Sequence, residues 1–590
     1  MWNGASRACV VGLILLVGRG WASGADTSVP DRLVIEEPTF VCLGVEWFVK
    51  GDDNGNATVE FCYRKAGEAD WREAMPLWRV DSTGRIRKVP EGEVLFAGSI
   101  FGLEQGTKYE MKLSLKDPDG GNTEKIVGAT TRTEPVIPEN MRQRWVVPGD
   151  GGGSGTKDDP FKGLKVADAA AQPGDIFNLA AGTYKGPVAF MKSGAEGKPI
   201  VWRGPADNSA AIDGGGAERG VSAIGVSHVW LWHLSVGNAA YAVVAHQSSY
   251  IVMRHCRVYD TDNGFTATRN PMKGIAVLDN DFDGWVPWRI DGKRVCYPNT
   301  IFRFNGKRYD VTDVLAVNVS GEGSVVAFNR MKAWGDGIHG SGDQPKCAND
   351  LYGNEISDCG DDGIECDEGA QNIRCFGNRI TNCFQGISTQ PLHGGPCYIF
   401  RNALYNTNYE PFKLHNSPHG VLLINNTSVR SADEGGPEFV HTSDPVFHVW
   451  AGNNLFAGGN NGYALEMSPK MTNCAFDYNG YAGGPFASFA KWNGVIYKTL
   501  ADFEKEARQE EHGIVMPVKG LFASGVMPPE SPDKPVDVSA NNLLLDAGAK
   551  AVDAGYNFPG ITDGYKGEAP DLGAYELGTT LPHYGPRPEE

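Results

Sequence analysis

A repeat of 23 to 26 residues in the second half of the chain restricts its possible folds more than any other feature. Residues 336–339, 362–365 and 385–388 align, and each segment has Gly-Ile at its centre, at steps of 26 and 23 residues. Each segment follows an asparagine, namely Asn329, Asn354 or Asn378. A repeat of this length, built from short β-type runs, Asn and Gly, predicts a solenoid with one coil per repeat. Leucine-rich repeats have a similar period, but their Leu-x-x-Leu-x-Leu pattern is absent from this sequence.

We expect the solenoid to span residues 148–480. No long helical pattern follows Ile176 within this range, whereas Asp159-Pro160 predicts the start of a short helix that covers the N-terminal end of the core. Residues 481–590 are less regular and are predicted to form C-terminal coils and a capping tail. Within that tail, residues 570–576 are expected to close the other end of the solenoid.

A small β-sandwich is predicted before the solenoid, over residues 30–133. Apolar and polar residues alternate in 58–64 and 109–116, and 76 glycines in the whole chain favour many tight turns. The stretch Leu103–Tyr109 resembles the corner between the fifth and sixth strands of fibronectin type III domains. Residues 134–147, which contain prolines, are predicted to be a linker.

The first 24 residues predict export of the protein. Arg7 precedes an apolar run over 10–17, and small residues at 22–25 offer a cleavage site, which is typical of a signal peptide. The run is too short to span a membrane, and no other stretch is long enough. We therefore expect a secreted protein, in the periplasm, on the cell surface or outside the cell. The 54 basic and 72 acidic residues, a net charge of −18, argue against a nucleic-acid partner.

Aligning the three repeats places chemically active side chains in two rows. Asp336, Asp362 and Gln385 occupy one position of the repeat, with Asp361 beside them. The second row holds His339, Glu365 and Ser388. Equivalent positions of neighbouring coils lie about 4.8 Å apart, so stacked carboxylates repel and at least one should have a raised pKa. Two carboxyl groups of different pKa are what glycosidic hydrolysis requires.

The repeat and this acidic cluster resemble the right-handed parallel β-helix of pectate lyases and polygalacturonases. The polygalacturonase pattern has one Asp, an Asp-Asp pair one coil later, a His-Gly and an Arg-x-Lys. Asp336 matches the first element, Asp361-Asp362 the second, and Lys413, followed by His415, the last. The sequence departs from the pattern at Gln385-Gly386, where the His-Gly would fall. The resemblance implies an all-β enzyme that acts on polysaccharides, with Asp336, Asp361 and Asp362 as catalytic groups.

The region before the acidic cluster supplies further candidates. Residues 284–318 interrupt the repeat, and a long insertion with aromatic and basic side chains favours a sugar-binding role. Together with His339, Glu365, Lys413 and His415 from the coils, its Trp285, Trp288 and Arg289 are predicted to hold the substrate. Asp279, Asp281 and Asp283 have the spacing that opens a calcium loop, although Ile290 stands where the closing Glu belongs.

Three functions remain open at this stage. The leading hypothesis is a monomeric glycoside hydrolase with a polysaccharide substrate and no required cofactor. The second is a polysaccharide lyase, in which Lys273, Lys332 or Lys413 removes a proton beside a uronate carboxylate and Ca²⁺ bound at Asp279, Asp281 and Asp283 neutralises that carboxylate. The third is a surface scaffold that binds glycans without catalysis.

Overall fold

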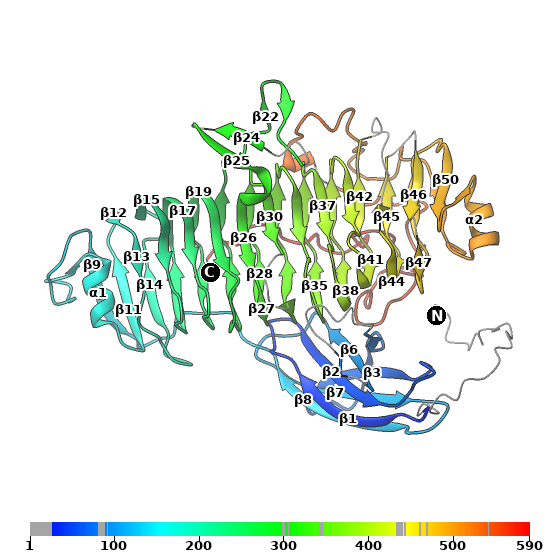
Figure 1. Cartoon of the computed structure of the whole chain (residues 1–590), viewed down its shortest axis with the longest axis horizontal. Coiled ribbons are helices and arrows are strands. Elements are labelled where there is room, and N and C mark those ends of the chain that lie inside the picture. Colours follow the sequence, from blue (N-terminus) through cyan, green and yellow to red (C-terminus); the bar gives the residue numbers. More distant parts are fainter. Residues whose placement is uncertain are drawn as a thin grey trace, which may run out of the picture.

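The computed structural model describes residues 26–80, 89–90, 92–297, 301–304, 306–340, 346–431, 440–441, 444–458, 462–467, 470–540 and 542–589. The predicted signal peptide therefore lies outside the described residues. The rest is almost entirely β-structure, with a small module beside a long stack of coils (Figure 1). The predicted fold class, a parallel β-helix preceded by a small β-sandwich, is confirmed.

The small module consists of two four-stranded antiparallel sheets. The first contains β1 (Val29–Ile35), β2 (Leu43–Lys50), β6 (Glu93–Ile100) and β5 (Trp78–Arg79). The second contains β4 (Arg72–Glu73), β3 (Thr58–Lys65), β7 (Lys108–Lys116) and β8 (Thr123–Thr130). Trp47 and Phe61 are buried in the core between the sheets. The hydroxyl of Tyr109 accepts a hydrogen bond from the backbone N–H of Glu104 at 2.9 Å, which fixes the corner noted in the sequence.

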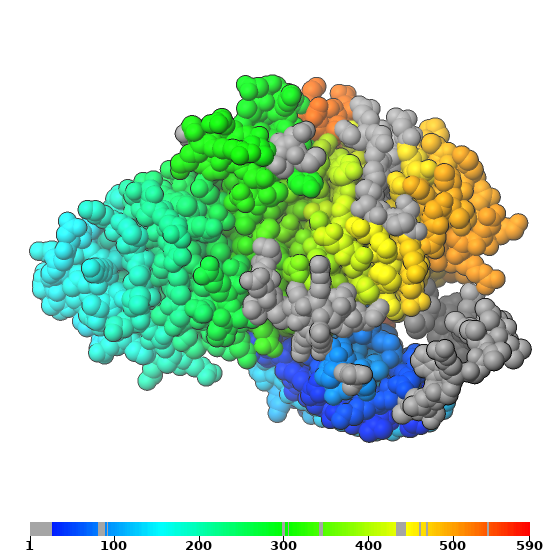
Figure 2. Space-filling view, viewed as in Figure 1, coloured from blue at the N-terminus to red at the C-terminus, as the bar shows by residue number. Residues whose placement is uncertain are grey.

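The module packs on one side of the coils instead of hanging from a free linker (Figure 2). Apolar side chains of both units form one buried cluster, including Trp78 and Phe101 from the module and Tyr398 and Phe400 from the coils. Asn372 of the coils donates to the Glu36 carboxylate at 2.8 Å. The second half of the predicted linker, β9 (Arg142–Val147), pairs in parallel with the strands of the first coil, so the solenoid begins there and not at residue 148.

The coils of the β-helix stack their strands into two large parallel sheets. In one of them the strands follow the order β10 (Phe161–Lys162), β9, β11 (Asp175–Leu179), β14 (Ile200–Arg203), β16 (Val229–Trp232), β18 (Val252–Arg254), β20 (Ala276–Leu278), β28 (Val325–Ala327), β32 (Asp350–Tyr352), β35 (Ile373–Phe376), β38 (His393–Phe400), β41 (His419–Ile424) and β44 (Val446–Gly452). Both β47 (Met471–Thr472) and β48 (Ala475–Asp477) pair with β44.

The other sheet turns a corner within each of the later coils, so that two of its strands belong to one coil. Its strands are β12 (Gly182–Lys185), β13 (Val188–Ala189), β15 (Ala210–Ser222), β17 (Leu234–Val244), β19 (Arg257–Ala267), β21 (Asp281–Asp283), β26 (Leu315–Val319), β29 (Arg330–Lys332), β30 (Asp336–His339), β33 (Glu355–Ser357), β34 (Asp362–Glu365), β36 (Arg379–Thr381), β37 (Gln385–Ser388), β39 (Ala403–Tyr405), β40 (Glu410–Lys413), β42 (Thr427–Val429), β43 (Val440–His441), β45 (Leu455–Ala457), β49 (Gly480–Ala482) and β52 (Ile514–Met516).

Short elements lie outside these two sheets. The insertion before the acidic cluster forms the hairpins β22 (Arg289–Ile290) with β23 (Lys293–Arg294) and β24 (Ile301–Phe304) with β25 (Lys307–Asp310), followed by the 3₁₀ turn η1 (Val311–Asp313). The remaining elements are β27 (Gly321–Glu322), β31 (Lys346–Cys347), β46 (Tyr463–Met467), β50 (Ser488–Trp492), β51 (Val495–Tyr497) and η2 (Val538–Ala540).

The repeated asparagines form a buried ladder at one turn of the coils. From one coil to the next, a side-chain amide donates to the side-chain oxygen of the following asparagine at 2.9–3.1 Å and to a backbone carbonyl. The ladder consists of Asn280, Asn329, Asn354, Asn378, Asn402, Asn426, Asn454 and Asn479. Glu510 ends it, because its carboxylate accepts from Asn479 at 2.8 Å. Pairing of this kind offsets the free-energy cost of burying polar side chains.

The two ends of the stack are closed by helices. α1 (Leu164–Ala170) covers the N-terminal end as predicted, but it begins at Leu164, since residues 161–162 pair as β10. α2 (Leu500–Ala507) covers the C-terminal end, where Phe503 is fully buried. Residues 570–576, predicted to close that end, run along the side of the coils instead, where Asn425 donates to the Asp571 carbonyl at 2.8 Å. Neither helix in the described part of the chain is long and apolar enough to cross a membrane.

Candidate functional site

The strands β30, β34, β37 and β40 place the predicted rows in register. Asp362 lies beside Gln385, which lies beside Glu410, and Ile338 lies beside Ile364, so Asp336 occupies the same position one coil earlier. We call this line of side chains the Asp336 row: Asp336, Asp362, Gln385 and Glu410. The His339 row consists of His339, Glu365, Ser388 and Lys413. Both rows predicted from the sequence are therefore present in the structure, and each extends one coil further.

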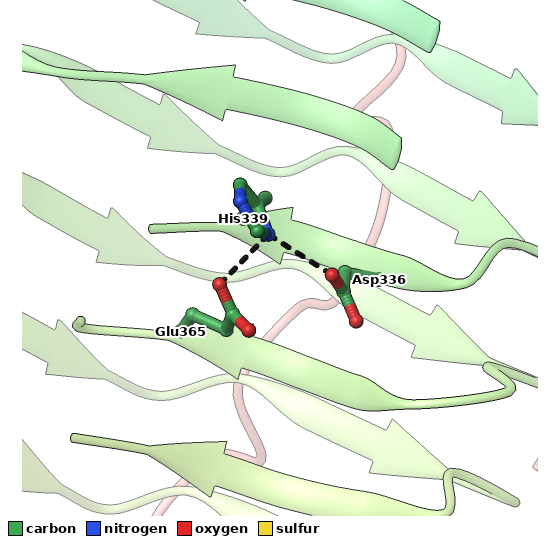
Figure 3. Close-up of side chains that lie close together, drawn as sticks. All are labelled: Asp336, His339 and Glu365. Carbon is green, nitrogen blue, oxygen red and sulfur yellow. Dashed lines mark hydrogen bonds and ion pairs between the residues drawn. The ribbon is translucent and has the colours of Figure 1, made fainter. Parts of the chain in front are cut away.

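His339 joins the two rows. Its Nδ1 lies 3.0 Å from Asp336 Oδ2 and 2.8 Å from Glu365 Oε2 (Figure 3). Burial favours the neutral ring, but the two carboxylates outweigh that effect and raise the pKa of His339 to about 10. Burial also favours a neutral Glu365, but His339 lowers the pKa of this carboxyl to about 2. Burial, followed by the charge of Glu365, raises the pKa of Asp336 to about 6.

Three carboxylates converge below this histidine. One oxygen each from Asp336, Asp361 and Asp362 lies within 4.8 Å of the others, and all three residues are buried. Burial raises the pKa of Asp361 and of Asp362, and the other carboxylates add to the shift. The Oδ1 atoms of Asp361 and Asp362 are buried, and neither has a hydrogen-bond partner among the residues that the structure describes. An unpaired buried carboxylate oxygen is costly, so this arrangement suits a cation that is not one of the chain's own side chains.

Lys413 supplies positive charge at the edge of the three carboxylates. Its Nζ lies 2.6 Å from Asp362 Oδ2, and its side chain is 8% exposed. Burial alone favours the neutral amine, but the neighbouring carboxylates, Asp362 first, raise the pKa of Lys413. The site therefore combines a compact group of acids with one amine that contacts it.

The insertion packs over the turns that lead into the cluster. A Cβ on Gly335 would lie 1.7 Å from the Val311 carbonyl oxygen, and one on Gly360 would lie 2.5 Å from the Val311 side chain. Only glycine permits this close approach. The insertion therefore fixes the backbone just before Asp336 and Asp361.

Three of the predicted substrate-binding residues have other roles. Trp285 stacks on Phe304 inside the insertion, and its Nε1 donates to the Thr261 carbonyl at 2.8 Å. Trp288 and Arg289 both donate to the carbonyl of Asp533, which ties the insertion to the C-terminal tail. These contacts hold the insertion in place, and the predicted contact of the three side chains with substrate stays a prediction.

His415 lies at the end of the Asp336 row. Its Nε2 lies 3.4 Å from Glu410 Oε1, so it is adjacent to the candidate site without contacting the three carboxylates of the cluster. Its predicted contact with substrate stays a prediction.

The structure does not bring the carboxylates of the predicted calcium loop together. Asp279 is buried and paired with Arg254 and Arg587 at 2.9 and 2.8 Å. Asp281 pairs with Arg330, and Asp283 pairs with Arg257. Among the described residues, the groups close enough to share a metal ion are Asp336, His339 and Glu365, and Asp336, Asp361 and Asp362. The carboxylates at 279–283 are neutralised by arginines and do not converge.

The sequence analysis missed three charged residues of the site. Glu410 continues the Asp336 row, and its position could have been found by continuing the repeat through Pro411-Phe412. Asp367 accepts from the Ser388 hydroxyl and the Gln390 backbone at 2.7 Å each, and burial raises its pKa to about 8. Lys346 is buried beside Glu365, and burial lowers its pKa. Asp367 and Lys346 follow no repeat, so no pattern pointed to them.

Comparison with known proteins finds only distant similarity. No protein-family model matches the chain, and no curated protein matches it. Among solved structures, pectate lyase Pel9A is 19% identical over 74% of this chain and 96% of its own, with a TM-score of 0.41. XylC in complex with xylose is 11% identical over 74% and 98%, with a TM-score of 0.42. Alginate lyase from Paenibacillus sp. str. FPU-7 is 16% identical over 53% and 94%, with a TM-score of 0.32. Similarities this low carry no argument about reaction or substrate.

Proposed function

We propose that this chain is a polysaccharide lyase that cleaves a uronate-containing polymer by β-elimination. The observation that carries the proposal is the convergence of one oxygen each from Asp336, Asp361 and Asp362 within 4.8 Å, with the amine of Lys413 in contact with Asp362. Asp361 and Asp362 each also have a buried oxygen that no described residue pairs with. Oxygen ligands of this kind suit Ca²⁺. This site replaces residues 279–283 as the candidate calcium site.

The chemistry divides between the acids and Lys413. A bound Ca²⁺ would neutralise the substrate carboxylate and so acidify the proton beside it. The same ion would offset the carboxylate charge that raises the pKa of Lys413, so that this residue can be present as the neutral amine. The neutral amine of Lys413 takes that proton from C5 of the uronate and becomes an ammonium, the electron pair forms the C4–C5 double bond, and the C4–O bond to the leaving sugar breaks. The leaving oxygen takes a proton from solvent. The products are one saturated end and one unsaturated, ultraviolet-absorbing end.

A glycoside hydrolase, the leading hypothesis from the sequence, is the second candidate. It is favoured by the separated pKa values of Asp336, about 6, and Glu365, about 2, which are those of an acid and a base held by one histidine. The short distances count against the inverting form of this reaction. An inverting enzyme needs its two carboxyls about 6.5–9.5 Å apart so that water fits between them. One oxygen of Asp336 lies within 4.8 Å of one oxygen of Glu365, and one oxygen each of Asp336, Asp361 and Asp362 lie equally close to one another.

Product analysis tests the proposal. The purified protein is incubated with polygalacturonate, alginate, xylan and an α-glucan, and both reducing ends and ultraviolet absorbance are followed. We expect absorbance to rise with reducing ends on an acidic polymer and to stop when the Ca²⁺ is chelated. Reducing ends without absorbance would refute the lyase and support the hydrolase.

A lysine variant tests the assigned base. Lys413→Ala should lower turnover by about 10²–10⁴-fold, the usual contribution of a general base. Lys491→Ala is the matched control, since Lys491 also pairs with a carboxylate, Glu466, at 2.8 Å on β50. Equal activity of the two variants would refute Lys413 as the base.

Export follows as part of the proposal. A polymer substrate lies outside the cell, which agrees with the signal peptide predicted over residues 1–24. A monomer also stays a prediction.

A further inference from the structure

An open groove of about 570 Å³ leads away from the acidic cluster toward the N-terminal coils. His339 lines one end of it, so the groove and the cluster share this side chain. Its other lining residues come from β17, β19, β25, η1 and β26. The groove therefore crosses several coils and is not confined to one.

The floor of the groove continues the Asp336 row. Tyr241 lies beside Asn263, which lies beside Leu315, which lies beside Asp336. Tyr241, Asn263 and Leu315 all line the groove. Because neighbouring coils are about 4.8 Å apart, the three steps from Tyr241 to Asp336 form a track about 14 Å long that ends at the acids. An extended polymer lying on this track would have its next unit at the acidic cluster.

The hairpin β24–β25 forms the wall of the groove and rises beside β19 and β26 (Figure 1). Tyr309 of the hairpin hydrogen-bonds to the Asp262 carboxylate on the floor, and the charge of Lys307 acts on the same carboxylate. Both contacts hold the hairpin against the coils. Asp313 is the other carboxylate of the lining.

Arg308 is the cation of this wall whose charge does not stabilise the fold through a contact with a described residue. It is exposed and lines the groove, and it forms no ion pair or side-chain hydrogen bond with any residue that the structure describes. A guanidinium can bind a carboxylate through two parallel hydrogen bonds, which suits a uronate and not a neutral sugar.

We propose that this groove binds the acidic sugar residues next to the cleaved bond, with Arg308 holding a uronate carboxylate and Tyr241 supporting the chain from below. The inference rests on the proposed function and adds the residue that selects the substrate. It makes Arg308 a specificity-determining residue outside the acidic cluster.

Binding in the Lys413→Ala background tests the inference without turnover. Hexasaccharides of galacturonate and of alginate, with cellohexaose as the neutral probe, are titrated calorimetrically in the presence of Ca²⁺. Adding Arg308→Ala should weaken binding of an acidic hexasaccharide about ten-fold, and Arg308→Lys should restore part of it. Lys293→Ala is the control, because Lys293 is an exposed cation on the neighbouring hairpin that does not line the groove.

The outcomes separate this inference from the proposed function. Equal affinity of the Arg308→Ala and Lys293→Ala proteins, or absence of acidic hexasaccharide binding, would overturn the inference. In the otherwise unaltered enzyme, Arg308→Ala should raise KM about ten-fold and leave kcat within about two-fold. The reason is that Arg308 would bind the substrate equally strongly in the ground state and in the transition state. Arg308-dependent binding together with saturated products would leave the groove in place and refute only the lyase.

Discussion

Glu510, the residue that ends the asparagine ladder, makes the stability of the β-helix depend on pH. Glu510 is 1% exposed and accepts hydrogen bonds from the side chain and backbone of Asn479 and from the hydroxyl of Tyr481. These three bonds favour the charged form, but burial outweighs them and raises the pKa of Glu510 from 4.5 to about 8. A glutamine would keep an acceptor at this position and could not ionise.

The sign and size of the effect follow from this pKa. A carboxyl with a raised folded-state pKa is stabilising below the unfolded value of 4.5, and that stability is lost as the pH rises to about 8. Each pH unit in this window costs about 1.36 kcal/mol, so about 4 kcal/mol is lost over the three units from about pH 5 to about pH 8. Glu510→Gln should therefore be stabilised relative to the natural protein by up to about 4 kcal/mol at about pH 8, and by about 1 kcal/mol or less at about pH 5.

Urea unfolding of the two proteins across this pH range measures the difference. Comparing them cancels the contributions of Asp336 and Asp367, whose raised pKa values act in the same direction. Glu506→Gln, an exposed substitution on α2, is the control and should unfold like the natural protein at every pH. Parallel pH profiles for Glu510→Gln and the natural protein would refute a buried neutral carboxyl at the end of the ladder.

Three further predictions follow from the same structure. Asn378→Ala should lower the free energy of unfolding by about 2–4 kcal/mol, because the buried backbone N–H of Asn354 loses its acceptor, and the side chains of Asn354 and Asn402 each lose one hydrogen bond. A loss below about 0.5 kcal/mol in urea unfolding would contradict the ladder. Asp361→Asn should lower activity by about 10²–10⁴-fold. Its melting temperature should hold or rise, because one of three repelling carboxylates is gone, and a large fall in melting temperature would argue against that repulsion. Removing residues 26–133 should give insoluble protein, because it exposes the apolar side chains of Tyr398 and Phe400 to solvent. A soluble and active remainder would show that the module is dispensable.

Much of the fold could be predicted because its signals repeat. The Gly-Ile pairs and the asparagines recur once per coil, so each copy supports the others, and they gave the period, the stacking and the two rows. Signals that occur once were less reliable. Asp159-Pro160 looked like a helix start, but pairing of residues 161–162 with β9 delayed the helix to Leu164. The C-terminal tail runs back along the coils through contacts such as Arg587 with Asp279, and a single sequence gives no periodic signal for contacts of this kind.

The error over calcium shows what distinguishes a structural acid from a functional one in a solenoid. Asp281 lies in a row that alternates in charge from coil to coil: Arg257, Asp281, Arg330, Glu355 and Arg379. Each carboxylate there has an arginine as its neighbour, so the row stabilises the stack and has no need of a metal. In the Asp336 row the neighbour of a carboxylate is another carboxylate, and burial adds to the cost. Like charges in register raise the free energy of the folded chain, and in this cluster Lys413 contacts Asp362 and His339 contacts Asp336. The sign of the charge across neighbouring coils, and not the spacing along the chain, therefore separates the arginine-paired acids of residues 279–283 from the clustered acids Asp336, Asp361 and Asp362.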